Sequence, residues 1–409
     1  MNFLNGFIYY KSYIFAGNYQ KPVFLHKQQA LIHLTQNKMM RKQFFIYGFI
    51  LLFIFNIKAQ EEQQDKDIKL TELIDQTKIS GQWFLSHEYD ITKDLNQFKL
   101  KRGYFTFKTR LNDMFSVRYT QDITLDQEGE DAGNVEMRLK YLYIKMFPFK
   151  TGFFEHSSLE FGLIHRPWLD YEQSINPYRV QGKMFAEEHH LLNSADFGLA
   201  FSGLIGGEMN QEYQKNIGRK YPGKYGSYSF GIYNGPGYHA AEANNNKTAE
   251  GRLSLRPLPD FIPGLQFTYA FVFGKANIPG NKADFNMNIF FISQQTKHLT
   301  ITGQYLTGTG NSSGSLYIPA EKESMNNEGF SFFGEIKIPK TNFAFFSRYD
   351  HFENYYNTNI LDISQNFQSI ISGIAYRFLK NKLILDYNRY IMEDGTSQEQ
   401  VEVAIEIKF

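Results

Sequence analysis

Cysteine is absent from the 409-residue sequence, which excludes a disulfide framework, a thiolate metal site and a cysteine nucleophile. A mean hydropathy of -0.42 excludes a bundle of transmembrane helices, each of which needs about 20 mostly apolar residues. Neither sign of charge prevails, with 43 Lys and Arg against 42 Asp and Glu, so the chain is not a globally basic nucleic-acid binder. A membrane protein built of strands stays open, because alternating apolar and polar residues average to a hydrophilic value.

The first 59 residues differ from the rest, since they carry seven basic residues and no acidic one. Arg41 and Lys42 precede the apolar run 44–55, and Ala59 supplies a small residue after it. This is the order of a secretory signal peptide; an uncleaved signal anchor is the alternative. We therefore predict an upstream extension at 1–38, a signal peptide at 39–59, a periplasmic leader at 60–80 and a single barrel domain at 81–409.

Apolar residues recur at every second position in several later segments, which excludes a helix there. In the last segment Val401, Val403, Ile405, Ile407 and Phe409 alternate with polar or small residues. One face of such a strand suits lipid and the other water, although a soluble β-sandwich also alternates.

Sixteen segments fit this strand pattern, and most have about the 9 to 11 residues that a tilted membrane strand needs. They are 82–90, 98–111, 114–125, 135–147, 157–166, 196–206, 226–234, 248–257, 264–275, 284–294, 297–307, 328–337, 342–351, 367–378, 381–390 and 400–409. We therefore predict an all-β fold, a transmembrane antiparallel β-barrel of about sixteen strands.

The connections between these segments alternate in length. Tight turns at 112–113, 295–296, 339–340 and 380–381 alternate with the longer loops 126–134, 167–195, 235–247, 308–327 and 352–366. Short turns at one end and long loops at the other are typical of outer-membrane barrels. The exception is 207–225, which is long where a short turn is due, so a strand boundary there is open to question.

Several stretches resemble the phosphate-selective porin O and P family in its Bacteroidota outer-membrane branch. The hairpin 98–122 is similar to the family's opening hairpin. The segments 166–172, 178–179 and 194–198 are similar to its long third loop and the following strand. Later matches are 233–238 and 348–350.

The resemblance implies a passive porin for small hydrophilic solutes in the outer membrane of a Gram-negative bacterium. It further implies inorganic anions such as phosphate as solutes, ion transport and a homotrimer. Expected partners are outer-membrane lipid, lipopolysaccharide and, through the terminal Phe409, the barrel-assembly machinery. The sequence leaves ion selectivity open, because residues 60–409 carry 36 basic against 42 acidic residues, a net charge of −6.

A barrel of about sixteen strands is wide enough for an aqueous channel, so a segment of the chain must narrow the lumen. We expect the longest loop, 167–195, to fold into the lumen and form the constriction. The candidate pore-lining residues come from the wall and from this region: Arg102, Arg118, Arg138, Arg166, Arg179 and Lys183. The alternative for each of them is an ordinary solvated lumen residue, balanced by nearby acids.

Other functions have weaker support. A barrel enzyme of the lipase or protease kind needs a grouped nucleophile and histidine, and no pattern here groups them, so we expect no enzymatic activity. An adhesin or receptor is the other alternative. Neighbouring His189 and His190 point to opposite faces of an extended chain, so we predict no metal site, and no cofactor.

Overall fold

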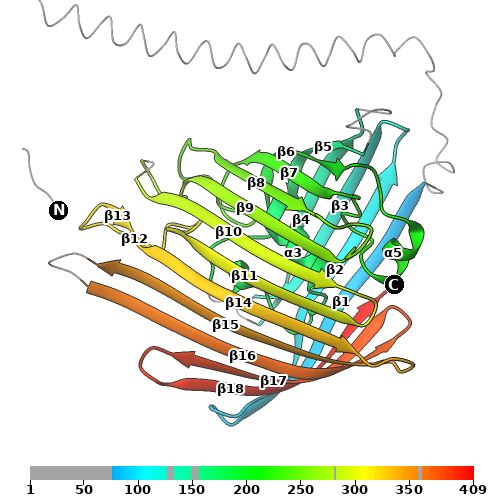
Figure 1. Cartoon of the computed structure of the whole chain (residues 1–409). Helices are drawn as coiled ribbons and strands as arrows, with labels where there is room; N and C mark the ends of the chain where they lie inside the picture. Colours follow the sequence, from blue (N-terminus) through cyan, green and yellow to red (C-terminus); the bar gives the residue numbers. More distant parts are fainter. Residues whose placement is uncertain (1–75, 127–132, 149–155, 281, 358–361) are drawn as a thin grey trace, which may run out of the picture. The chain divides into compact units, whose positions relative to one another are not determined.

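The computed structural model describes residues 76–126, 133–148, 156–280, 282–357 and 362–409, in which sixteen antiparallel strands close into one barrel (Figure 1). The barrel strands are β1 (Thr77–Asp90), β2 (Leu95–Arg110), β3 (Phe115–Leu125), β4 (Val135–Met146), β5 (Ser158–His165), β6 (Ala195–Ile205), β7 (Gly226–Tyr233), β8 (Thr248–Leu255), β9 (Leu265–Lys275), β10 (Asp284–Gln295), β11 (Leu299–Thr309), β14 (Asn326–Lys337), β15 (Phe343–Asn357), β16 (Asp362–Phe378), β17 (Asn381–Met392) and β18 (Ser397–Lys408).

The remaining elements lie in connections between these strands. They are the helices α3 (Pro167–Ile175), α4 (Phe185–Glu188) and α5 (Gln211–Asn216), and the small hairpin of β12 (Tyr317–Ile318) and β13 (Glu323–Ser324). Within the described residues, no helix is long and apolar enough to cross a membrane.

The predicted fold is confirmed, and each predicted strand overlaps one barrel strand. Two details of the prediction are wrong. Most of 352–366 is strand, because β15 and β16 continue to pair beyond the expected loop start. The connection 206–225 is long without any misplaced strand, since it contains α5. β1 begins at Thr77, inside the predicted leader; the predicted signal peptide lies outside the described residues.

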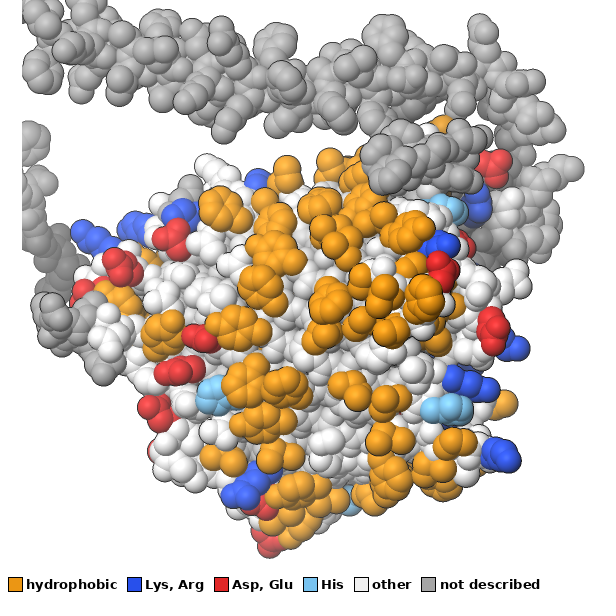
Figure 2. Space-filling model, viewed as in Figure 1, with side chains coloured by type: hydrophobic (Ala, Val, Ile, Leu, Met, Phe, Trp, Pro, Cys, Tyr) orange, Lys and Arg blue, Asp and Glu red, His pale blue; other side chains and the backbone are white. Residues whose placement is uncertain are grey.

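The outer face of the barrel is apolar. Outward side chains such as Phe267, Phe290 and Phe332 are about half exposed although they are large and apolar. Figure 2 shows such side chains spread over the strands in view, with charged side chains mostly toward the edges. A closed sheet leaves no unpaired backbone edge, so this surface can face hydrocarbon.

The sheet closes where β1 pairs with β18. Gly81 and Phe409 exchange two backbone hydrogen bonds, and the Phe409 ring packs edge-on against Trp83 at 5.7 Å. A Cβ atom at position 81 would lie 2.2 Å from the Phe409 ring, so any larger residue there would displace this ring.

Candidate pore and its constriction

The loop between β5 and β6, which carries α3 and α4, lies inside the barrel. At its start, the Arg166 guanidinium is fully buried and forms ion pairs with Asp196 (2.8 Å) and Glu250 (2.7 Å) on the wall. The prediction that Arg166 lines the pore is therefore wrong. Its charge is enclosed with two carboxylates, an arrangement that anchors the loop.

The loop then crosses to the opposite wall. The Tyr178 ring stacks on Phe346 at 4.0 Å, and its hydroxyl donates to Glu335. Lys382 donates to the carbonyl of Pro177, and Arg348 donates to the carbonyl of Lys183. These contacts join residues 177–183 to β14, β15 and β17, so the loop spans the lumen.

An apolar cluster holds the helical part of the loop against the inner face of β9, β10 and β15. Trp168 lies edge-on to Phe291 at 5.2 Å, and Phe185 lies edge-on to Phe352 at 6.0 Å. The cluster also contains Ile289 of β10, and all of these side chains are buried. This half of the inner wall is therefore packed against the loop.

Two cavities lie between the loop and the other half of the wall. The turn-side cavity, near the end of the barrel with the turn 379–380, has a volume of about 610 Å³, and the loop-side cavity has about 330 Å³. The basic side chains of the turn-side cavity are Lys78, Lys108, Arg118, Lys140, Arg179, Lys220, Lys380 and Lys408; its acidic ones are Asp170 and Glu406. The loop-side cavity has Lys99, Lys101, Arg102, Arg179 and Lys183 against Glu88, Glu188 and Glu402.

Arg179 of the loop borders both cavities. Its guanidinium forms an ion pair with Glu187, also of the loop, at 3.0 Å. Of the predicted residues, Lys183 lines the loop-side cavity and Arg118 the turn-side cavity.

Arg102 and Arg138 come together on the facing wall. Both form ion pairs with the buried Asp122, at 3.4 and 3.3 Å, and the hydroxyl of Tyr238 donates to the same carboxylate. Arg138 also lies 3.5 Å from Glu136, so two guanidinium groups and two carboxylates meet on this part of the wall.

Two β-bulges each turn one additional side chain to the inside of the barrel, which strict alternation did not predict. Phe84 pairs with Arg102 and Leu85 with Leu100, so Lys101 is an extra residue in β2. Its ammonium reaches Glu402 at 2.7 Å inside the barrel, next to the inward-facing Arg102. A bulge places two neighbouring side chains on one face, which strict alternation forbids.

The second bulge makes Lys140 the extra residue of β4, since Thr120 pairs with Tyr141 and Gln121 with Leu139. Lys140 and Tyr141 are both buried within the lumen, although strict alternation would place Tyr141 on the outer face with Leu139. The signal for this shift is in the sequence, because Leu142 continues the apolar series in the opposite phase.

Lys140 has polar but uncharged partners. Its ammonium donates to Ser194 at 3.0 Å and to the Tyr104 hydroxyl at 3.3 Å. It also lies 4.9 Å from the ring centre of Tyr104 and 5.1 Å from that of Tyr238. Among the described residues, no carboxylate lies within ion-pair distance of Lys140, so its direct partners are hydroxyl groups and aromatic rings.

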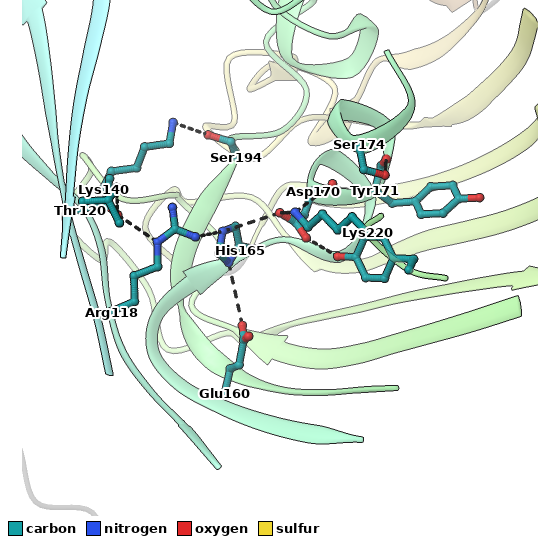
Figure 3. A network of polar contacts seen from close by, with 12 residues as sticks. Arg118, Thr120, Lys140, Glu160, His165, Asp170, Tyr171, Ser174, Ser194 and Lys220 are labelled. Atoms are coloured by element: carbon teal, nitrogen blue, oxygen red, sulfur yellow. Dashed lines mark hydrogen bonds and ion pairs between the residues drawn. The ribbon is translucent and has the colours of Figure 1, made fainter. Parts of the chain in front are cut away.

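A polar network lines the turn-side cavity around His165 (Figure 3). Its Nε2 is 3.0 Å from Nη1 of Arg118 and 3.6 Å from Asp170, and its Nδ1 is 3.9 Å from Glu160. Because an arginine cannot accept a hydrogen bond, neutral His165 accepts from Arg118 at Nε2. The imidazole is therefore engaged with charged groups and not with a serine hydroxyl.

One buried acid of the loop stands apart. Burial raises the pKa of Glu172 to about 8, although Arg348 opposes this effect. Asp350 and Glu187, which also face it, raise the pKa further. Glu172 therefore keeps its proton at neutral pH. Within the described residues, no group of three His, Cys, Asp or Glu is arranged to hold a metal ion.

Known outer-membrane channels share this fold. OmpF of Salmonella typhi, in a complex with daunomycin, matches with a TM-score of 0.54 at 12% identity, over 81% of this chain and 97% of that one. An anion-selective porin from Comamonas acidovorans matches with 0.53 at 9%, over 81% and 99%. OmpT of Vibrio cholerae without its loop L8 matches with 0.53 at 12%, over 81% and 99%.

No protein-family model and no curated protein matches the sequence. At these identities the structural matches establish the fold alone. The chain has the porin-like barrel of an outer-membrane protein, with a closed sheet, an apolar outer face and a loop folded into the lumen.

Proposed function

We propose that this protein is a passive porin that prefers small anions, phosphate among them, and that it belongs to the phosphate-selective porin O and P family. The observation that carries the proposal is the excess of basic side chains along both cavities, with eight basic against two acidic in the turn-side cavity. Low-dielectric walls strengthen the field of such charges, which raises the local concentration of anions.

The constriction in this proposal lies at Arg179, where the two cavities meet, with Arg102 and Lys140 on the facing wall. Arg118 and Lys183 lead to it from either side, and Arg138 supports it by sharing Asp122 with Arg102. An anion that leaves one basic group thus meets the next, so that weak successive binding lets it pass.

We further propose that the protein is not an enzyme. The support is local: Arg118 occupies the His165 nitrogen that a serine nucleophile would need.

A homotrimer, contacts with lipopolysaccharide and recognition of Phe409 by the barrel-assembly machinery remain part of the proposal. Cross-linking of the folded protein in outer-membrane preparations tests the trimer, because it yields a three-chain band only if the trimer exists.

The test of the channel is single-channel recording of the refolded chain in planar bilayers, with a KCl gradient and added phosphate. We expect stable current steps and a reversal potential whose sign shows that anions permeate more readily than cations. We also expect phosphate to block the current in a concentration-dependent way. Lys140→Met weakens the block, whereas Lys297→Met, on an exposed turn residue, leaves it unchanged. Stable steps without anion preference would leave a general porin, and no steps from a folded barrel would overturn the proposal.

A further inference from the structure

The β6–β7 connection, residues 206–225, folds back onto the packed half of the barrel at its turn side. The N-cap Asn210 accepts a hydrogen bond from the backbone of Tyr213, which fixes the start of α5. The buried Tyr213 ring lies against the guanidinium of Arg256 at 4.4 Å, next to the end of β8. The connection is therefore attached to the wall by its own side chains.

The same connection reaches the loop that crosses the lumen. Lys220 forms an ion pair with Asp170 of α3, and the Tyr221 hydroxyl donates to the other oxygen of that carboxylate. Figure 3 shows Lys220 extending to Asp170 beside His165. Two segments that enter from opposite ends of the barrel thus meet at one carboxylate.

A stack of rings supports this meeting point. The Arg252 guanidinium lies 4.4 Å from the ring centre of Tyr171 and 4.6 Å from that of Tyr221. Because Tyr171 belongs to α3 and Tyr221 to the connection, one wall residue contacts both. The two rings are also 5.6 Å apart.

Asp170 links the meeting point to the wall of the pore. It lies 3.6 Å from His165, which in turn contacts Arg118 in the turn-side cavity. Burial by itself raises the pKa of Asp170, but the charge of Lys220 and the hydrogen bonds from Lys220 and Tyr221 hold that pKa well below its usual range. The carboxylate is therefore ionised and able to hold both neighbours.

We propose, on the basis of the proposed channel function, that the connection 206–225 positions the constriction loop from the turn side. Lys220 and Tyr221 are the positioning residues. Without them, α3 loses its fixed partner while the rest of the loop keeps its anchors at Arg166 and Tyr178. The loop then moves among several arrangements, and the pore switches among several widths.

The experiment compares the double variant Lys220→Met/Tyr221→Phe with the full-length wild type in planar bilayers. We expect several-fold more frequent substates and closure at lower voltage, with the fully open conductance retained. The single variant Lys220→Arg keeps the ion pair with Asp170, so we expect its current to be as steady as that of the wild type. The matched control is Lys224→Gln, since Lys224 lies in the same connection but pairs with Asp260 at 3.4 Å, away from the loop.

A second readout does not depend on conduction. Trypsin added to the folded barrel is expected to cut the double variant at Arg179 or Lys183, while the wild type and Lys224→Gln stay intact there. If the wild type does not conduct, the proposed function fails and trypsin alone decides the role of the connection. Current and trypsin resistance equal to the wild type in the double variant overturn the inference.

Discussion

The two halves of the inner wall differ in kind although they belong to one sheet. On the packed wall, the inward residues of β9 to β11 include Val272, Met287, Ile289 and Leu306, all buried in the cluster that holds the loop. On the open wall, formed by β1 to β4, inward positions are occupied by basic residues such as Arg102. One half of the inner wall is therefore packed like a protein core, and the other half carries charged side chains beside the cavities.

The difference follows from what each half contacts. Each large apolar side chain buried against the loop contributes about 1.5–3 kcal/mol, which fixes the loop on the packed wall. Charges there would be costly to bury without partners. On the open wall, Arg102 and Arg118 border the cavities, so in the proposed channel their charges are available to solutes.

The largest expected effect comes from breaking the anchor on the packed side. Arg166→Met leaves Asp196 and Glu250 buried without their cation, and we expect a loss of about 3–5 kcal/mol. The measurement is the temperature at which the folded band is lost on unboiled gels. The matched change on the open wall, Arg138→Met, removes a partly exposed cation and costs less than about 1 kcal/mol. Equal losses for the two variants would remove the distinction between the walls.

A second, smaller effect depends on pH. The pKa of Glu172 is raised from 4.5 to about 8 in the folded protein, so the folded state binds its proton more tightly than the unfolded state. This contribution is complete below pH 4.5 and is lost as the pH rises through 8, by on the order of 2 kcal/mol between pH 6 and 9.

Thermal unfolding of the folded barrel at pH 6, 7.5 and 9 checks this expectation. The wild type loses stability over this range, whereas Glu172→Gln, which cannot ionise, loses less. A pH dependence that is the same in both proteins would show that another group is responsible.

The smallest effect concerns selectivity alone. Lys108→Gln/Lys380→Gln removes two cations of the turn-side cavity that pair with no acid among the described residues. We expect the anion-to-cation permeability ratio to fall several-fold while stability stays unchanged. Lys297→Gln/Lys340→Gln removes two exposed cations from turns outside the cavities and serves as the control. Reversal potentials in a KCl gradient measure the permeability ratio of both double variants. A similar change in the two would mean that the overall charge of the protein, and not the cavity, sets selectivity.

The strands and the inward loop were predictable because period-two alternation and loop length are local properties of the sequence. Of the candidate pore residues, Arg102, Arg118, Arg179 and Lys183 border a cavity, and their role in a pore stays a prediction. The burial of Arg166 was not, because its carboxylate partners lie 30 and 84 residues away. The inward positions of Lys101 and Tyr141 were not predicted, because a bulge shifts which face of the strand a residue occupies.

The packed wall also left a signal in the sequence. In β10 the inward residues Phe285, Met287 and Ile289 are apolar, while Asn286 and Asn288 between them face outward. On the wall of an open channel, the inward residues are polar and the outward residues are apolar. This inversion indicates that something apolar fills the lumen, but only the structure identifies the filler as the loop.

The most direct test of the account compares how well a thiol reagent reaches two positions inside the barrel. Because the sequence contains no cysteine, the reagent reacts only at an introduced one. Thr106→Cys places a thiol on the turn-side cavity, and Thr268→Cys places one beneath Tyr171 on the packed wall. A charged thiol reagent is added during single-channel recording of each variant. The account predicts a stepwise fall in current for the variant at 106 and none for the variant at 268. Equal block at both positions, or none at 106 in a conducting channel, would contradict a path that runs between the loop and the open wall.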